Sequence, residues 1–176
     1  EEEGNASTVI WFSDSRKVLA VLSISDAIRN TSAEAVRKLE ALGIDVYLVT
    51  GDNGRTAGAV AERTGIRHFR AGMLPSDKED FIKELQSSGR IVGMAGDGIN
   101  DSQALARADV SIAMGKGSDI AIDAAGMTII GNDLSVIPSA IRLSRNTVRT
   151  IRQNLFWAFI YNVIGIPVAA GALYAF

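Results

Sequence analysis

The hexapeptide GDGIND at residues 96–101 carries two carboxylates, Asp97 and Asp101, on a glycine-rich backbone. It directly follows the short apolar run at residues 91–95, which predicts a strand that ends where the acidic loop begins. Such a loop can hold a divalent cation and still offer backbone N–H groups to a phosphate. The ordinary alternative is a strand-to-helix turn in which Asn100 or Asp101 caps the next helix.

Around this loop, short apolar runs alternate with helical patterns, which predicts an α/β fold with a parallel sheet and right-handed crossovers. Ser76 and Glu79 form a capping box that supports the start of one helix. The loops after residues 49 and 95 both follow strands, so they should meet at the carboxyl edge of the sheet, where such folds bind ligands. We expect strands at residues 44–49, 91–95, 110–114 and 127–130, and helices at residues 31–42, 55–64, 76–89, 102–108 and 119–125.

The two ends of the chain differ from this pattern. Apolar runs at residues 8–12 and 17–25 predict a hairpin or two sheet strands, and residues 26–30 form a connector. At the other end, a long helix at residues 134–152 should lead into residues 155–176, which carry no charge. A hydrocarbon core needs roughly 20 such residues in a helix, so we expect a transmembrane helix there, with a buried core helix as the alternative. The preceding helix would place a row of arginines at the membrane interface: Arg142, Arg145, Arg149 and Arg152.

Composition narrows the classes of function. The chain has 176 residues, with 18 Lys and Arg against 20 Asp and Glu, and all the acidic side chains precede residue 142. No basic patch is interleaved with aromatics, so no nucleic-acid partner is expected. Cysteine is absent, which excludes disulfides and thiolate metal sites within this chain. The acidic start at residues 1–3 is unlike a signal peptide.

Two further motifs accompany the acidic loop: TGDN at residues 50–53 and LPSDK at residues 74–78. A hydroxyl, a lysine and an acidic pair in this chain order resemble the later motifs of the haloacid dehalogenase superfamily. The string GDGINDSQALARADV at residues 96–110 resembles a narrower family, the P-type ATPases. The string IRQNLFWAFIYNVIGIPVAAG at residues 151–171 resembles the copper-transporting class of that family. The resemblance covers nearly the whole chain from about residue 26 onward.

The resemblance implies an incomplete Rossmann-like parallel sheet of the haloacid dehalogenase type, followed by a long helix that runs into a transmembrane helix. It divides the chain into the tail of a nucleotide-binding domain (1–25), the second half of a phosphorylation domain (26–133), a basic juxtamembrane helix (134–154) and a transmembrane helix (155–176). The phosphorylated aspartate of the family lies in an Asp-Lys-Thr-Gly-Thr motif, and no such string occurs here. We therefore expect the fragment alone neither to hydrolyse ATP nor to transport.

The resemblance also assigns roles to the loop after residue 49. It implies that Thr50 and the backbone of Gly51 bind the phosphoryl group, that Asp52 shapes their loop, and that Lys78 neutralises the phosphoryl charge. The ordinary alternatives are a strand end for Thr50, a turn former for Asp52 and a solvated side chain for Lys78.

The acidic loop and the connector complete the expected site. On the same resemblance, Asp97 binds Mg²⁺, Asn100 donates to a phosphoryl oxygen, and Asp101 orients the lysine from beside the Mg²⁺ site. Asp26 and Arg29 match the hinge that leads into the phosphorylation domain, and we assign them to cofactor binding.

Tyr161 and Asn162 are adjacent polar side chains inside the apolar run. A buried amide without a partner costs about 2–7 kcal/mol, so Asn162 should face protein or an ion path. In the copper class this pair belongs to the intramembrane Cu⁺ site, which cysteines of another helix complete. The alternative is helix–helix packing through a polar residue.

The expected function is thus part of an ATP-driven, copper-exporting P-type ATPase of the cell membrane, with the phosphorylation domain on the cytoplasmic side. Its cofactors would be Mg²⁺ and ATP, and Cu⁺ its cargo. Expected partners are the rest of the pump, the lipid bilayer and a copper chaperone. Gln103 in place of a proline and Ser111 in place of a glycine depart from the family pattern. The alternatives are a membrane-tethered, catalytically incomplete module that binds Mg²⁺ and phosphate, and a soluble phosphatase.

Overall fold

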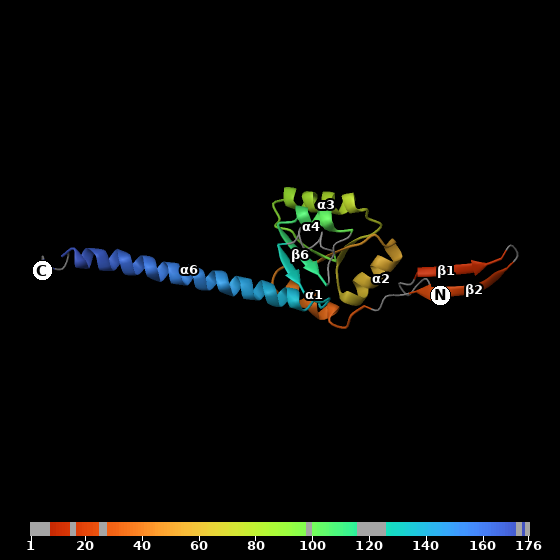
Figure 1. Cartoon of the computed structure of the whole chain (residues 1–176), viewed down its shortest axis with the longest axis horizontal. Coiled ribbons are helices and arrows are strands. Elements are labelled where there is room, and N and C mark those ends of the chain that lie inside the picture. Colours follow the sequence, from red (N-terminus) through yellow and green to blue (C-terminus); the bar gives the residue numbers. More distant parts are fainter. Residues whose placement is uncertain are drawn as a thin grey trace. The chain divides into compact units, whose positions relative to one another are not determined.

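The computed structural model describes residues 8–14, 17–24, 28–97, 100–115, 126–171 and 174 (Figure 1). The chain divides into two compact units, one up to Val136 and one from Ile137 onward. The first unit contains the strands and the helices α1 to α4, and the second consists of the long helix α6. Asp26 and the helix expected at residues 119–125 lie outside the described residues.

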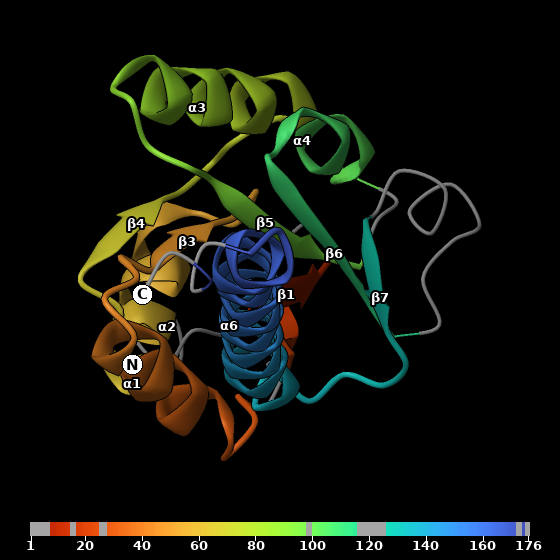
Figure 2. The same cartoon turned by 90° about the vertical axis from the view of Figure 1, so that its left-hand side faces the viewer.

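The central strands of the first unit form two separate parallel sheets (Figure 2). β3 (Tyr47–Val49) pairs with β4 (His68–Arg70), while β5 (Gly93–Gly96), β6 (Val110–Met114) and β7 (Met127–Ile129) form the second sheet in that order. The expected parallel α/β architecture is confirmed. β3 is shorter than expected, and β4 is absent from the sequence-based prediction because its three residues form no apolar run. Among the described strands, none pairs with the second edge of β3 or of β5, so each sheet ends in an open edge.

Four helices connect these strands, and their bounds agree with the prediction to within a few residues. They are α1 (Ser32–Ala41), α2 (Gly54–Thr64), α3 (Pro75–Ser87) and α4 (Ser102–Arg107). At the start of α2, the Asn53 Oδ1 atom accepts a hydrogen bond from the Thr56 N–H at 2.9 Å. The helix ends at Gly65, whose φ of +79° is readily adopted only by glycine.

The capping box expected from Ser76 and Glu79 does not start α3. The helix begins at Pro75, and the Asp77 Oδ2 atom accepts a hydrogen bond from the Leu74 N–H at 2.9 Å. Proline suits the first helical position because its missing N–H would be unpaired there anyway. The start of α3 is therefore fixed just ahead of the lysine expected at the site.

The core of the first unit lies where α4 packs on the second sheet. Leu105 and Ala113 are fully buried, and Met94 of β5 packs against them. α3 packs on α4, and the ring of Phe81 in α3 meets Tyr47 of β3 edge-on with centroids 5.7 Å apart. These contacts hold the loops after β3 and β5 in one body.

β1 (Thr8–Ser13) and β2 (Val18–Ile24) form the expected antiparallel hairpin. Thr8 pairs with Ile24 at one end and Ser13 with Val18 at the other, with a register shift after Phe12. Large apolar side chains such as Trp11 remain exposed on this hairpin.

α6 (Val136–Ala169) is one continuous helix that passes through Pro167 without interruption. Within the described ranges, no helix is both long enough and apolar enough to cross a membrane. Part of the transmembrane segment expected over residues 155–176 lies outside the described residues, so that expectation stays a prediction.

Candidate active site

An open cleft of about 480 Å³ lies at the carboxyl ends of β3, β5 and β6. It brings together five residues that the sequence places at the site: Arg29, Thr50, Lys78, Asp97 and Asp101. The remaining lining residues are Val49, Ala95, Gly96, Met114, Asn132 and Leu134. The loops after residues 49 and 95 therefore do meet at one edge of the fold, as parallel strands require.

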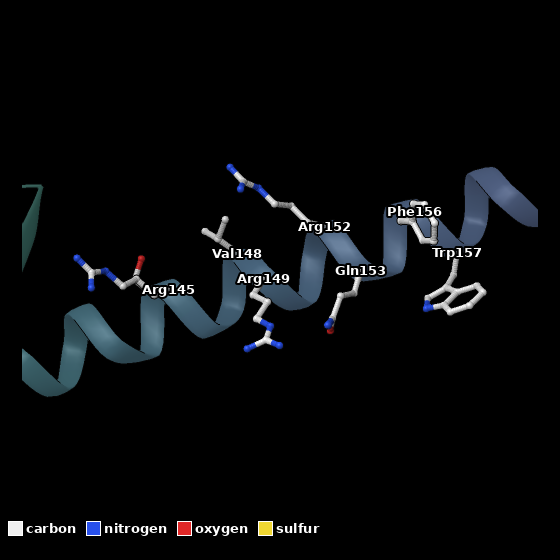
Figure 3. A pocket seen from close by; sticks show the side chains of 8 residues that line it. Arg145, Val148, Arg149, Arg152, Gln153, Phe156 and Trp157 are labelled. Carbon is white, nitrogen blue, oxygen red and sulfur yellow. The ribbon is translucent and has the colours of Figure 1, made fainter. Parts of the chain in front are cut away.

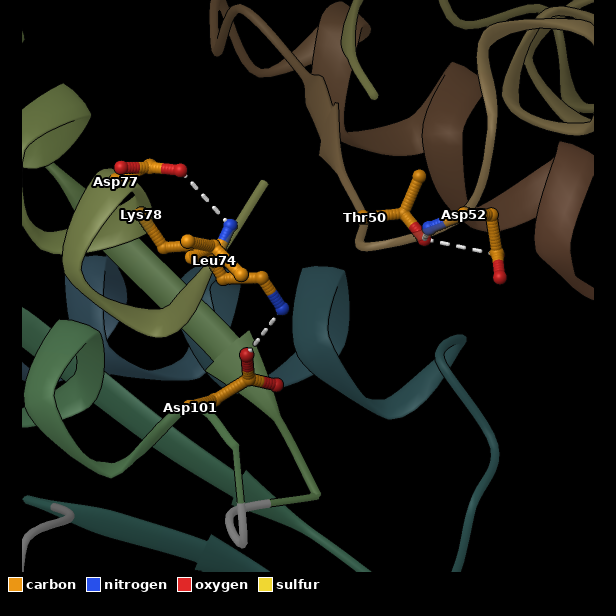
Figure 4. Close-up of polar contacts among 6 residues, drawn as sticks. All are labelled: Thr50, Asp52, Leu74, Asp77, Lys78 and Asp101. Carbon is orange, nitrogen blue, oxygen red and sulfur yellow. Dashed lines mark hydrogen bonds and ion pairs between the residues drawn. The ribbon is translucent and has the colours of Figure 1, made fainter. Parts of the chain in front are cut away.

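The loop after β3 is fixed around Thr50. The Thr50 N–H donates to the Arg70 carbonyl and the Thr50 carbonyl accepts from the Met73 N–H, both at 3.0 Å. The Thr50 hydroxyl donates to the Asp52 carboxylate at 2.8 Å and accepts from the Asp52 N–H at 3.1 Å (Figure 4). Asp52 thus shapes the loop, and Thr50 must exchange this bond before its hydroxyl can donate to an anionic ligand.

Lys78 and Asp101 form an ion pair beside the cleft (Figure 4). The Lys78 Nζ atom lies 2.7 Å from Asp101 Oδ1, and the two side chains are only 11% and 14% exposed. Asp101 occupies the N-cap position of α4, but its carboxylate makes no capping hydrogen bond. The turn alternative is right that Asp101 is the N-cap residue of α4, although its carboxylate pairs with Lys78 rather than capping the helix. The solvated alternative for Lys78 is wrong.

Gly96 is required at the end of β5 because Asp101 packs against its Cα. A Cβ atom at residue 96 would lie 2.5 Å from Asp101 Oδ2 and 3.1 Å from Asp101 Cβ. Any larger residue would push the carboxylate away from Lys78.

The donor set of the cleft fits Mg²⁺ in part. Asp97 is exposed at the cleft, and its carboxylate makes no hydrogen bond within the part of the chain that the structure describes. Mg²⁺ is usually held by one or two carboxylates together with phosphate oxygens and waters, which suits Asp97 with Asp101 close by. Within residues 28–97, 100–115 and the other described ranges, no three His, Asp or Glu side chains converge. Further ligands would have to come from a phosphate or from outside these residues.

Other expected site residues lie apart from this cleft. Gly51 and Asp52 belong to the adjoining loop but do not line the cleft, and Asn100 is exposed and does not line it either. In α6, Tyr161 is exposed and the Asn162 amide donates to the Ala158 carbonyl of its own helix at 2.8 Å. The side-chain amide of Asn162 therefore has a hydrogen-bond acceptor within its own helix and does not need a second helix to supply one.

Asn132 and Leu134 line the cleft but are missing from the sequence-based site. The Asn132 Oδ1 atom lies so close to Gly115 that a Cβ at residue 115 would overlap it. Gly115 has a φ of +81°, and its N–H donates to the carbonyls of Ile129 and Gly131 at 3.1 and 2.8 Å. The loop after β7 also follows a parallel strand, so the position of Asn132 at the carboxyl edge could have been predicted from the strand expected at residues 127–130.

The same loop carries a hydrogen-bonded carboxylate, Asp133. It accepts from the Ser135 N–H at 3.0 Å and from the Ser135 hydroxyl at 2.7 Å. These bonds, the neighbouring Thr31 hydroxyl and the positive charge of Arg29 hold the pKa of Asp133 below its ordinary value.

Comparison with known proteins identifies the class to which this fold and cleft belong. The sequence model of the haloacid dehalogenase-like hydrolases matches residues 1–109, more than half of the chain. The chain therefore belongs to the haloacid dehalogenase-like hydrolase family.

Nearly the whole chain is also similar to metal-transporting P-type ATPases, which confirms the narrower resemblance. It is 54% identical over 172 residues to the probable copper-transporting ATPase PacS of Synechocystis, covering 98% of this chain and 23% of the relative. It is 48% identical over 168 residues to a silver exporting P-type ATPase of Salmonella typhimurium, covering 96% and 20%. A solved zinc-transporting PIB-type ATPase in its E2.Pi state matches with a TM-score of 0.85 and 35% identity, covering 97% of this chain and 28% of that one. The chain spans about a quarter of the length of the curated relatives it matches.

Proposed function

We propose that this chain supplies the Mg²⁺- and phosphate-binding loops of the phosphorylation domain in a copper-exporting P-type ATPase. The observation that carries the proposal is the cleft that gathers Thr50, Lys78, Asp97 and Asp101 in one place. The similarity to copper- and silver-transporting ATPases supports the assignment to this class of pump.

Each residue of the cleft has a task that its geometry supports. The ammonium group of Lys78 is held by Asp101 and would neutralise phosphoryl oxygens that enter the cleft. The Thr50 hydroxyl would donate to the same oxygens after it releases Asp52. Asp97 would hold Mg²⁺, and the bound cation would neutralise charge on the transferring group.

The acceptor of the phosphoryl group must come from outside this chain, because the sequence contains no Asp-Lys-Thr-Gly-Thr motif. β3 and β5 each keep an edge that no described strand occupies, and the cleft is lined from the ends of both strands. A strand added at these edges would bring a following side chain to the cleft, since parallel strands end at a common edge. The first partner is therefore the remainder of the same pump, which would also supply most of the ATP site. In this proposal Asp26 and Arg29 connect the nucleotide-binding part to the cleft.

The cargo we propose is Cu⁺, with Tyr161 and Asn162 as part of its path in the membrane. Asn162 uses its NH₂ group within α6, which leaves its carbonyl oxygen available. Cu⁺ prefers sulfur ligands, and the chain has no cysteine, so the remaining ligands belong to other helices of the pump. The pump would lie in the cell membrane with the cleft on the cytoplasmic side, where a copper chaperone could deliver the ion.

Steady-state ATP hydrolysis tests this proposal. The purified chain should show no Mg²⁺-dependent turnover, whereas the full-length protein should show copper-stimulated turnover that Asp97→Ala abolishes. Asp80→Ala is the matched control, because Asp80 is an exposed carboxylate of α3 that forms an ion pair with Lys83 away from the cleft. Turnover by the chain alone that is lost in Asp97→Ala would overturn the claim that the chain is incomplete.

The absent nucleophile motif also favours a second candidate, a membrane-tethered regulatory module that binds Mg²⁺ and phosphate without catalysis. The size of the native product separates the two candidates. A product several-fold heavier than 18.7 kDa supports the pump, and a product near 18.7 kDa supports the module.

A further inference from the structure

The first half of α6 carries a row of positive charge along one face. Arg142, Arg145, Arg149 and Arg152 follow at spacings of three and four residues, which places them on the same side of a helix. The last acidic residue of the chain is Asp133, so no carboxylate of α6 balances this charge.

This basic face continues directly into a pair of aromatic side chains. A shallow groove along α6 is lined by Arg145, Arg149, Arg152, Phe156 and Trp157, together with smaller side chains (Figure 3). The rings of Phe156 and Trp157 meet edge-to-face with centroids 5.6 Å apart, and both are more than half exposed. From Leu155 onward the helix has no charged side chain. The helix thus changes from cationic to apolar within about two turns.

We infer that this face, from Arg145 to Trp157, binds the phosphate groups of anionic lipids at a bilayer surface. The inference deepens the proposed function, because it rests on the pump lying at a membrane and names the lipid chemistry that α6 recognises there. The planar guanidinium group of arginine matches phosphate oxygens and keeps its charge at any physiological pH. Tyrosine and tryptophan rings are enriched where one end of a side chain is wet and the other apolar.

The spacing along the helix fits a lipid headgroup layer. At 1.5 Å per residue, Trp157 lies about 12 Å along the axis from Arg149 and about 7.5 Å from Arg152. The headgroup region of one leaflet is roughly 5–8 Å thick, and arginine side chains reach several ångströms toward the water. The aromatic pair can therefore sit at the acyl boundary while both arginines contact phosphate.

An acidic protein surface could pair with the arginines, but it would leave the apolar side chains of the following helix turns exposed to water. Leu155, Phe159 and Val163 are exposed on α6 beyond the arginine row. A cationic segment followed along the helix by exposed apolar and aromatic side chains is typical of helices that enter a membrane from its surface. We therefore choose a lipid surface over a protein partner.

Vesicle flotation of the full 176-residue chain tests the inference. The chain should bind vesicles of phosphatidylcholine mixed with phosphatidylserine more tightly than vesicles of phosphatidylcholine alone, and added salt should weaken this preference. The double variant Arg149→Gln/Arg152→Gln should bind the mixed vesicles about 25-fold more weakly, or about fivefold for each arginine. The matched control is Arg37→Gln/Arg63→Gln, which removes the same charge from exposed positions in α1 and α2.

Three results would overturn the inference. The first is equal binding to both kinds of vesicle, and the second is an equal loss of vesicle binding in the two double variants. The third is a chain that binds a synthetic acidic peptide but neither kind of vesicle. Circular dichroism of the variants excludes lost helicity as the cause of lost binding. The assay uses neither ATP nor copper, so its failure leaves the pump proposal intact, and failure of copper-stimulated hydrolysis leaves the vesicle result intact.

Discussion

The Nζ atom of Lys78 lies 2.7 Å from Oδ1 of Asp101, and this ion pair joins the first turn of α3 to the acidic loop before α4 (Figure 4). The two residues are distant in sequence, and both side chains are largely shielded from solvent. A pair of this kind costs desolvation energy to form but is strongly destabilising to break from one side. It therefore fixes where a positive charge faces the cleft.

Replacing Lys78 should show how much this ion pair contributes to the stability of the fold. Lys78→Met leaves the Asp101 carboxylate without its counter-ion and should lower the free energy of unfolding by about 2–4 kcal/mol. Lys83→Met is the control in the same helix. Its ammonium group is 46% exposed beside Glu79 and Asp80, so the loss of stability should be much smaller. Urea unfolding of both variants measures the difference, and equal losses would show that the Lys78 pair has no special role.

A methyl group at residue 96 should disturb the Lys78–Asp101 ion pair by displacing the Asp101 carboxylate. Gly96→Ala places a Cβ against the Asp101 carboxylate, whereas Gly93→Ala in the same strand meets only ordinary contacts with Val110 at 3.7 and 4.0 Å. We expect Gly96→Ala to abolish copper-stimulated ATP hydrolysis in the full-length protein, and Gly93→Ala to retain most of it. If Gly96→Ala is as active as Gly93→Ala, the position of Asp101 does not matter for the reaction.

Asn132 can be probed through its contact with Gly115. Gly115→Ala combines an unfavourable positive φ with overlap on the Asn132 amide, while Gly43→Ala has a similar φ of +76° and open space around it. The control should lose about 1–2 kcal/mol of stability from backbone strain alone. Gly115→Ala should lose clearly more in thermal or urea unfolding. Equal losses would mean that the Asn132 side chain moves aside freely.

Acid should remove the contribution of Asp133 to stability. Hydrogen bonds from the Ser135 backbone and the Ser135 hydroxyl, with the Thr31 hydroxyl nearby, hold the pKa of Asp133 below its ordinary value of 3.8. A carboxyl group whose pKa is lower in the folded state stabilises the fold above its unfolded pKa, and this contribution is lost as the pH falls through the folded pKa.

The unfolding free energies of wild type and Asp133→Asn should therefore differ by a constant amount from neutral pH down to about pH 5. The difference should shrink below about pH 4, where the carboxyl group protonates in the unfolded state but still keeps its charge in the folded state. Urea midpoints across this range supply the measurement. A difference that grows on acidification would have the wrong sign for a depressed pKa.

The elements that the sequence predicted well are those with a local signal. β6 occupies residues 110–114 as expected, because an apolar run there is bounded by Asp109 and by Gly115 with its positive φ. β4 could not be predicted, since three exposed residues become a strand only by pairing with Tyr47–Val49. The start of α3 was misplaced because Pro75 and Asp77 compete with the box that Ser76 and Glu79 suggest.

The cleft was predictable to the extent that motifs and sheet edges reveal it. Thr50, Lys78, Asp97 and Asp101 were found because each lies in a motif. Asn132 belongs to no motif, so the sequence could place it at the cleft only through the strand expected just before it. The pairing of Thr50 with Asp52 also depends on side-chain rotamers that a sequence does not specify.

Phosphorylation of the native protein tests the central claim most directly. Membranes of the source cell are incubated with copper and γ-labelled ATP, quenched in acid, and probed with an antibody raised against residues 50–101. We expect a copper-dependent, acid-stable label on a band several-fold heavier than 18.7 kDa, and loss of that label when Asp97 is replaced by alanine. An unlabelled band near 18.7 kDa, or label that persists in Asp97→Ala, would show that the chain is not part of such a pump.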